Sequence, residues 1–378
     1  MRSIYLSLIL LAVSLSLSAS TTLTMMSGGI QRDLIIHLPP TYTPGQHLPV
    51  VFNFHGYTST AAQQETYSGM DANADTNNYI VIYPDGISNS WNVGWTGNYW
   101  TGVDDVRFVS DMIDTLYHLY SIDLTRVYAT GLSNGGFLSH RLACELEYRI
   151  AAIAAVSGTL TDSTYVYCHP TRIMPIMHIH GTSDPIVAYT GVPSSRSVEQ
   201  TIAFWVNKNT CGTPGDTTDL PNTDLADNCT VQKIDYPICN NNTRVLFYKI
   251  TGGGHTWPNG TTDITVFGNT DHDMDGNTEI WNFFKQYSWS GATLGIKVIN
   301  DQPATVKAYP NPFGDEIQIE SSHRIDEVEV FNILGERVYY SPENLMITSI
   351  HLDRLDRGIY LLKVSGKDYN YVERISKN

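Results

Sequence analysis

A pentapeptide near the middle of the chain has the residues of a serine nucleophile. Gly131-Leu132-Ser133-Asn134-Gly135 lies between an apolar run at 126–130, which predicts a strand, and a stretch at 137–147, which predicts a helix. On a tight strand-to-helix turn the serine hydroxyl is lifted above the edge of a sheet, and glycines on either side avoid steric clashes. The pentapeptide alone also occurs in ordinary glycine-rich turns. Its place between a strand and a helix favours a nucleophile at Ser133.

A serine nucleophile requires a general base and an acid that orients the base. On this kind of turn the chain order is serine, then Asp or Glu, then histidine. His255 lies in a glycine-rich loop after a predicted strand at 245–250 and is the predicted base. The other histidines that fit the order lie in an acidic run or in the charged tail: His272, His323 and His351. Asp184 directly follows a predicted strand at 176–180 and is the predicted acid, with Asp162 as its competitor.

The negative charge that develops when a serine attacks an acyl carbon requires two convergent N–H donors. The first donor is predicted to be the backbone of Asn134, at the start of the helix. The second is predicted to be the backbone of Tyr57, in the loop His55-Gly56-Tyr57 after a predicted strand at 49–54. His55 itself is interpreted as hydrogen-bonded scaffolding.

Aromatic residues gather in a loop after Pro84-Asp85-Gly86, at the same predicted edge of the sheet. Aromatic rings there serve either core packing or stacking on an aromatic acyl group or a sugar, and both readings stay open. The residues predicted to bind substrate are Trp91, Trp95, Trp100 and Trp257.

The segment Asp271-His272-Asp273-Met274-Asp275-Gly276 resembles the start of an EF-hand loop. The twelfth position, which supplies a bidentate acid in that loop, is Asn282. Helix capping before a predicted helix at 279–287 is therefore favoured over a calcium site at Asp271, Asp273 and Asp275. Metal-ligand spacing of cysteines is absent, so the sequence predicts neither a metal nor a cofactor.

Five cysteines form an odd set, and their spacing leaves many pairings open. The preferred arrangement joins Cys144 to Cys168 and Cys211 to Cys239, with Cys229 free. Disulfides are compatible with export, and residues 1–19 have the form of a secretory signal peptide: one positive charge, an apolar run and small residues at the end. An N-terminal membrane anchor is the alternative, and no other stretch approaches the ~18 apolar residues of a membrane span.

Strands and helices are predicted to alternate from residue 30 to residue 290. This is the pattern of an α/β fold, a mostly parallel sheet with helices on both faces. Residues 210–230 are rich in Thr, Asp, Pro, Gly and Asn and are predicted to form a long surface loop. The predicted strands are 49–54, 79–83, 126–130, 150–156, 176–180 and 245–250, and the predicted helices are 104–120, 137–147, 198–209 and 279–287.

Composition divides the 378 residues into a large unit and a small one. Charged residues are about twice as frequent after residue 300 as before it, and all seven tryptophans precede residue 290. We therefore predict a signal peptide at 1–19, an α/β unit at 20–300 and a small all-β sandwich at 301–378. The net charge of −15 argues against nucleic acid or anionic lipid as a partner, and 42% apolar residues with 16% charged residues exclude general disorder.

Six segments within 30–288 resemble secreted α/β-hydrolase esterases that include poly(3-hydroxybutyrate) depolymerases and feruloyl or acetyl xylan esterases. The resemblance implies a catalytic triad of Ser133, Asp184 and His255, in agreement with the order argument. The frequent cysteine of the oxyanion loop in that family is Tyr57 here. The matching segments are Phe54-His55-Gly56, Tyr83-Pro84-Asp85-Gly86, Gly102 to Phe108, Gly131 to Gly136, His180 to Asp184 and Gly253 to Pro258.

The tail from residue 304 resembles the C-terminal sorting domain of the type IX secretion system, through Tyr309-Pro310-Asn311-Pro312-Phe313 and Val328 to Gly335. That resemblance implies a Bacteroidetes-type cell, recognition by the type IX machinery and a secreted, extracellular or cell-surface protein. A carbohydrate-binding module is the alternative, and the absence of tryptophan from the tail argues against it.

Together these features predict a secreted serine ester hydrolase that acts on feruloyl or acetyl esters of plant cell-wall polysaccharides. A polyester depolymerase is the alternative within enzymes. A non-catalytic binding protein on a hydrolase scaffold is the alternative of another class.

Overall fold

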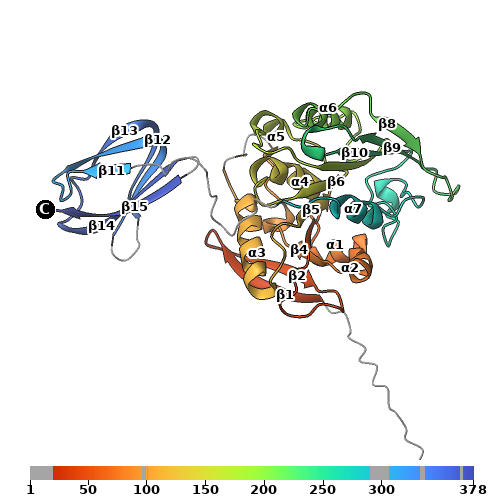
Figure 1. The fold of residues 1–378 in the computed structure, drawn as a ribbon, viewed down its shortest axis with the longest axis horizontal. Coiled ribbons are helices and arrows are strands. Elements are labelled where there is room, and N and C mark those ends of the chain that lie inside the picture. The colour runs from red at the N-terminus through yellow and green to blue at the C-terminus, as the bar shows by residue number, and fades with distance from the viewer. Residues whose placement is uncertain (1–19, 96–98, 100, 290–305, 333–336, 367–368) are drawn as a thin grey trace, which may run out of the picture. The chain divides into compact units, whose positions relative to one another are not determined.

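The computed structural model describes residues 20–95, 99, 101–289, 306–332, 337–366 and 369–378. The chain forms two compact units, Met1–Gly295 and Ile296–Asn378, which are described separately (Figure 1). The predicted signal peptide and the predicted unit boundary at residue 300 lie outside the described residues. Within the described ranges, no helix combines the length and the apolar character that a membrane crossing requires.

The first unit is built on a ten-stranded sheet in the order β1-β2-β4-β3-β5-β6-β7-β10-β9-β8. The six central strands, from β4 to β10, are parallel, and the two strands at each edge pair antiparallel. The strands are β1 Ser20–Ser27, β2 Ile30–His37, β3 Val50–Phe54, β4 Ile80–Pro84, β5 Val127–Leu132, β6 Ala152–Val156, β7 Ile176–Gly181, β8 Asp216–Asp219, β9 Thr230–Tyr236 and β10 Val245–Thr251.

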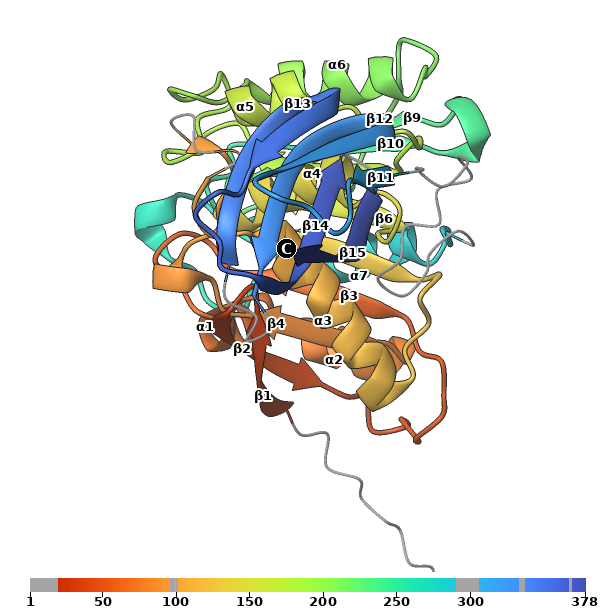
Figure 2. The same ribbon diagram turned by 90° about the vertical axis from the view of Figure 1, so that its left-hand side faces the viewer.

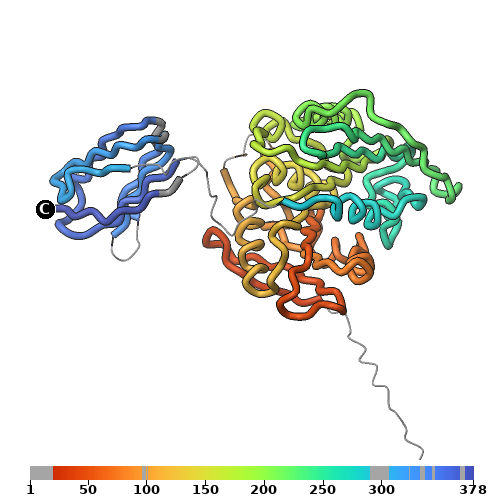
Figure 3. The backbone as a smooth tube through the Cα atoms, in the orientation of Figure 1, coloured from red at the N-terminus to blue at the C-terminus, as the bar shows by residue number. Residues whose placement is uncertain are grey.

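Helices cover both faces of this sheet, as the continuous tube in Figure 3 also shows. Successive strand residues alternate between two apolar cores, because side chains along a strand point to opposite faces. Ala129 packs with α3, α4 and α6, whereas its neighbour Tyr128 packs with α2 and α7 on the other face. The helices are α1 Ala61–Ser68, α2 Met70–Asn77, α3 Asp105–Tyr120, α4 Asn134–Glu145, α5 Asp162–Tyr167, α6 Val198–Lys208 and α7 Gly276–Phe284. The predicted α/β class is confirmed.

Several of the elements that the sequence pattern missed, among them α1, α2 and β8, have weak apolar periodicity. Helices α1 and α2 consist mostly of polar residues and bury few apolar side chains, among them Ala61, Met70 and Ala74. The prediction that 210–230 is a long loop is wrong in part, because β8 and the start of β9 lie within it. Every residue of β8 is exposed, so no alternation of apolar and polar residues marks it as a strand.

Two disulfides are present, Cys144–Cys168 and Cys211–Cys239, which is the preferred pairing. Cys229 is a buried free thiol. The first disulfide joins the end of α4 to the end of α5, and the second joins the segment after α6 to the segment after β9.

The second unit is all-β, as predicted, and every strand pair in its described part is antiparallel. Long strand β12 pairs with β13 along its length, with β11 through its first half and with β14 through its second half (Figure 2). The strands thus form one hydrogen-bonded sheet around a single apolar core, rather than two separate sheets. They are β11 Val306–Tyr309, β12 Glu316–Phe331, β13 Arg337–His351, β14 Gly358–Gly366 and β15 Tyr369–Lys377.

Candidate active site

Ser133 occupies the turn between β5 and α4 in a strained conformation, with φ 57° and ψ −117°. Two neighbouring glycines make the turn possible. A Cβ on Gly135 would lie 2.1 Å from the carbonyl oxygen of Phe54, and a Cβ on Gly131 would lie 2.6 Å from the same oxygen. The backbone of the turn is therefore pressed against the end of β3, and only glycine fits at both positions. Non-glycine residues in such conformations gather at functional sites.

Asp184 and His255 form a buried pair. His255 Nδ1 lies 2.7 Å from Asp184 Oδ2, and the two residues are 4% and 6% exposed respectively. The other carboxylate oxygen of Asp184 accepts backbone N–H groups from Ile186 and Val187, each at 2.8 Å. These bonds fix the orientation of the carboxylate, so that His255 donates from Nδ1 and keeps Nε2 as a proton acceptor.

The order of strands explains why these residues meet. Ser133 follows β5, Asp184 follows β7 and His255 follows β10, and all three strands belong to the parallel run β5-β6-β7-β10 of the central sheet. Parallel strands present their carboxyl ends at one edge. The loops after β7 and β10 approach closely there, because a Cβ on Gly181 would lie 2.2 Å from the carbonyl oxygen of Gly253.

A cavity of about 830 Å³ opens over this edge, and both Ser133 and His255 line it. Its wall includes the aromatic residues Tyr57, Tyr67 and Phe267 and the apolar residues Ile186 and Ile264. The side chain of Tyr57 is 67% exposed, although it is large and mostly apolar. The cavity thus offers exposed aromatic surface beside a serine and a histidine.

Both segments that carry the predicted oxyanion donors adjoin Ser133. A Cβ on Gly56, next to Tyr57, would lie 3.5 Å from the Cβ of Ser133. Asn134 is the first residue of α4, so its N–H has no acceptor within the helix. Its side-chain Oδ1 accepts the backbone N–H of Trp91 at 2.6 Å.

His55 and Trp91 brace the loop that carries Tyr57. His55 is fully buried, its Nε2 accepts the backbone N–H of Gly86, and its carbonyl oxygen accepts the indole N–H of Trp91 at 2.9 Å. Burial lowers the pKa of His55. His55 is thus hydrogen-bonded within the protein, which agrees with its interpretation as scaffolding.

The tryptophans predicted to bind substrate differ in how far they are exposed. Trp91 is 2% exposed and Trp257 is fully buried, with its indole N–H donated to Asn277 at 3.0 Å, so neither presents a ring to a substrate. Their loops are polar in sequence, but tertiary packing turns both rings into the core. Trp95 is partly buried and packs edge-on against Phe137 at 4.7 Å, and Trp100 lies outside the described residues. The aromatic residues of the cavity wall, Tyr67 and Phe267 among them, were missed because no local motif distinguishes them.

Three buried histidines form a hydrogen-bonded row that leads to Asp184 of the Asp184–His255 pair. Trp205 Nε1 donates to His140 Nδ1 at 3.1 Å, His140 Nε2 contacts His178 Nδ1 at 3.4 Å, and His178 Nε2 contacts His180 Nδ1 at 3.2 Å. His180 Nε2 donates to the carbonyl oxygen of Val187 at 2.8 Å and lies 3.4 Å from Asp184 Oδ2. An indole N–H can only donate, so Nδ1 of His140 is an acceptor and its proton lies on Nε2. The same relation then holds from ring to ring along the row, so each of the three histidines carries one proton, on Nε2, and is neutral. Burial lowers the pKa of His140 to about 3, that of His180 to about 4, and that of His178 well below its usual value.

The three residues that resemble an EF-hand loop, Asp271, Asp273 and Asp275, do not form one cluster. Asp275 is the N-cap of α7 and accepts the backbone N–H of Thr278 at 2.8 Å, as the capping interpretation expects. Asp271 and Asp273 instead lie with Asp227, which is far away in the sequence and had no motif to indicate it.

Two family models match the chain. A phospholipase/carboxylesterase model matches residues 104–213, which include the Ser133 turn and Asp184. A secretion system C-terminal sorting domain model matches residues 307–378. The chain is secreted and combines an α/β-hydrolase fold with a C-terminal sorting domain. The solved acetyl xylan esterase from Aspergillus awamori shares this hydrolase fold, with a TM-score of 0.51 at 16% identity over 70% of this chain and 99% of that chain.

Curated relatives of the hydrolase include esterases of several substrates. A bifunctional acetylxylan esterase/xylanase of Neocallimastix patriciarum is 26% identical over 70% of this chain and 34% of the relative. Feruloyl esterase B of Piromyces equi is 29% identical over 68% of this chain and 45% of the relative. A poly(3-hydroxyalkanoate) depolymerase of Paucimonas lemoignei is 33% identical over 29% of this chain and 28% of the relative. The chain therefore spans less than half the length of each of these relatives.

Proposed function

We propose that this hydrolase is a serine carboxylic ester hydrolase that works through an acyl-enzyme. The observation that supports this most strongly is the buried Asp184–His255 pair at 2.7 Å, at a cavity that Ser133 also lines from a strained turn. A nucleophile, a base and an orienting acid in this order are the parts that acyl transfer requires.

In the proposed reaction Ser133 Oγ attacks the ester carbon while His255 Nε2 takes the hydroxyl proton. The developing oxyanion is stabilised by the N–H groups of Asn134 and Tyr57. His255 then gives the proton to the leaving alcohol, and the acyl group remains on Ser133. Water, deprotonated by His255, attacks the acyl-enzyme and releases the acid, which restores the serine.

Asp184 has two tasks in this scheme. Its Oδ2 holds the His255 ring in the tautomer that keeps Nε2 free, and its charge stabilises the imidazolium that forms during each transfer. The N–H groups of Ile186 and Val187 bond to the second oxygen, so both oxygens of the buried carboxylate have a hydrogen-bond donor.

The cavity favours feruloyl esters over acetyl esters as substrates. An acetyl group fills little of about 830 Å³, whereas an aromatic acyl group can pack against Tyr57, Tyr67 and Phe267. The polysaccharide chain would then lie outside the cavity as the leaving group. We further propose that the type IX secretion machinery recognises the C-terminal unit.

Replacement of the serine tests the mechanism. Ser133→Ala is expected to lower kcat/KM for an activated short-chain ester by at least ~10⁴-fold, because the acyl-enzyme no longer forms. Ser59→Ala is the matched control, since Ser59 lines the same cavity without occupying the turn, and it should stay within a few-fold of the parent. Turnover that is unchanged in Ser133→Ala contradicts the proposed mechanism.

The substrate class is tested by parallel incubation with feruloylated arabinoxylan, acetylated xylan and polyhydroxybutyrate, with the released acid measured. Ferulate as the main product supports the proposal. Release of 3-hydroxybutyrate alone would establish the polyester alternative. If no ester, activated or natural, is hydrolysed, the chain is a binding protein on a hydrolase scaffold.

A further inference from the structure

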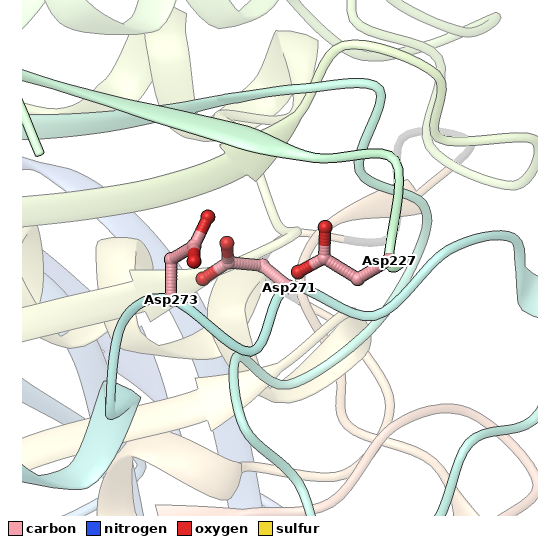
Figure 4. Close-up of side chains that lie close together, drawn as sticks. All are labelled: Asp227, Asp271 and Asp273. Carbon is pink, nitrogen blue, oxygen red and sulfur yellow. The ribbon is translucent and has the colours of Figure 1, made fainter. Parts of the chain in front are cut away.

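Three carboxylates from two distant segments lie together at one side of the hydrolase unit. Asp227 belongs to the connection between β8 and β9, and Asp271 and Asp273 belong to the segment that leads into α7. One oxygen of each lies within 4.8 Å of the others. Figure 4 shows Asp271 between the other two, with the carboxylate of Asp227 turned toward it.

The central carboxylate is buried and incompletely bonded. Asp271 is 1% exposed, its Oδ2 accepts the N–H of Met274 at 3.2 Å, and its Oδ1 has no hydrogen-bond partner within the described part of the chain. Asp273 is similar: its Oδ1 accepts N–H groups of Thr223 and Asp224, whereas its buried Oδ2 has none there. A buried carboxylate oxygen without a partner is unfavourable and points to a missing ligand.

No lysine or arginine among the described residues forms an ion pair with any of the three carboxylates. Three like charges at this separation repel one another strongly where water is partly excluded. A bound cation removes the repulsion and satisfies the open oxygens at the same time.

We propose that Asp227, Asp271 and Asp273 bind one divalent cation that prefers oxygen ligands, namely calcium. The donors are all carboxylate oxygens, which suit a hard cation rather than zinc or copper. Calcium takes six to eight oxygens at flexible geometry and completes its shell with water or carbonyl groups. This set differs from the EF-hand pattern of the sequence, because Asp227 replaces Asp275.

The cation would lock two loops together beside the segment that carries His255. The carbonyl oxygen of Asp271 accepts the N–H of Asn259, four residues after His255. On the other side, a Cβ on Gly252 would lie 2.2 Å from the carbonyl oxygen of Asn228, next to Asp227. The site therefore stabilises the folded state of the loops around His255 without contacting the cavity.

Calcium titration of the full chain after removal of metals with EDTA tests the proposal. We expect one saturable site by calorimetry, with a Kd on the order of 0.1 mM, as in other extracellular calcium sites. At a hundredfold excess over that Kd, the melting temperature should rise by about 5 °C or more relative to EDTA. Magnesium at the same concentration should give a smaller rise, because it requires a stricter octahedral shell.

Three variants separate a calcium site from a merely acidic surface. Asp271→Asn and Asp273→Asn should abolish both the binding heat and the calcium-dependent rise. Asp275→Asn is the matched control: it removes a neighbouring charge but keeps a good helix N-cap, and it should leave calcium binding unchanged.

The melting temperature of Asp271→Asn relative to the parent, measured in EDTA and in calcium, is the decisive comparison. In EDTA, Asp271→Asn should melt at or above the temperature of the parent, because the substitution removes a buried charge that has no positively charged partner. In calcium it should melt below the parent. Absence of binding heat and of a shift in the parent up to 10 mM calcium overturns the proposal, as does an equal loss in Asp275→Asn. If Asp271→Asn does not fold, the partly exposed Asp273→Asn decides by the same readouts.

Discussion

Acidification should destabilise the hydrolase unit through its buried histidine row. His140, His178 and His180 are neutral when folded, and their pKa values lie well below the value of about 6.5 expected in the unfolded chain. Below pH 6.5 the unfolded state therefore binds more protons than the folded state. The stability that the three neutral rings contribute is fully present above pH 6.5 and is lost as the pH falls toward 4.

The loss in the free energy of unfolding follows from the linkage between protonation and folding. Between pH 7 and pH 5 each ring that charges only on unfolding costs about 2 kcal/mol, so three cost about 6 kcal/mol. Carboxyl groups with a raised pKa act in the opposite direction, because on acidification they bind protons in the folded state before they do so in the unfolded chain. Burial raises the pKa of Asp71 and of Asp271 to about 6 and also raises the pKa of Asp105 and of Asp235, whereas the lowered pKa of His55 adds to the loss. Asp71 and Asp271 each offset about 1 kcal/mol between pH 7 and pH 5. A net loss of about 4 kcal/mol is large against a total stability of about 5–15 kcal/mol.

The assay is urea denaturation at pH 7, 6 and 5 in calcium-free buffer, followed by tryptophan fluorescence. The free energy of unfolding should fall with pH throughout this window. Labelled-histidine NMR on the folded protein supplies the second readout, in which three ring signals should remain those of neutral Nε2–H imidazole at pH 5.

Either of two results would refute the reasoning. Equal free energies of unfolding at pH 7 and pH 5 would show that the row does not control acid stability. Protonated signals for all three rings in the folded protein at pH 5 would show that the Trp205-to-His180 bonds do not fix the neutral state.

Two further predictions concern the serine turn and the C-terminal unit. Gly135→Ala should lower the free energy of unfolding by about 2 kcal/mol or more in urea denaturation, because its Cβ would lie 2.1 Å from the Phe54 carbonyl oxygen. Gly212→Ala is the control and should leave the free energy of unfolding nearly unchanged, because its Cβ would make only ordinary contacts at 3.7 Å. Equal losses of stability in both variants would contradict the steric argument. A chain that ends at residue 295 should keep esterase turnover after purification but should not be exported from a cell that has the type IX machinery. Fractionation of the culture into cells and medium measures this export. Export of the truncated chain would contradict recognition through the C-terminal unit.

The main elements of the hydrolase sheet were predictable because their signals are local. Strands such as β3 and β5 are short continuous apolar runs, and α3 carries a clear apolar stripe. The position of Asp184 and His255 at the same edge of the sheet as Ser133 was predictable for a related reason: each follows a recognisable strand, and parallel strands bring their carboxyl ends together. Strand β8 could not be recognised, since its pairing with β9 depends on backbone hydrogen bonds and not on side-chain pattern.

By itself, the sequence determined the α/β class, the all-β tail and the order of Ser133, Asp184 and His255, since periodicity, glycine placement and chain order are properties of neighbouring residues. Only the tertiary structure decided which aromatic rings face the cavity. Trp91 and Trp257 were predicted to bind substrate, with core packing left open as the alternative, and both are buried by packing between distant segments. The same holds for Asp227, which joins Asp271 and Asp273 across more than 40 residues of chain. Such contacts arise from the way loops cross at the edge of the sheet, and no local pattern records that crossing.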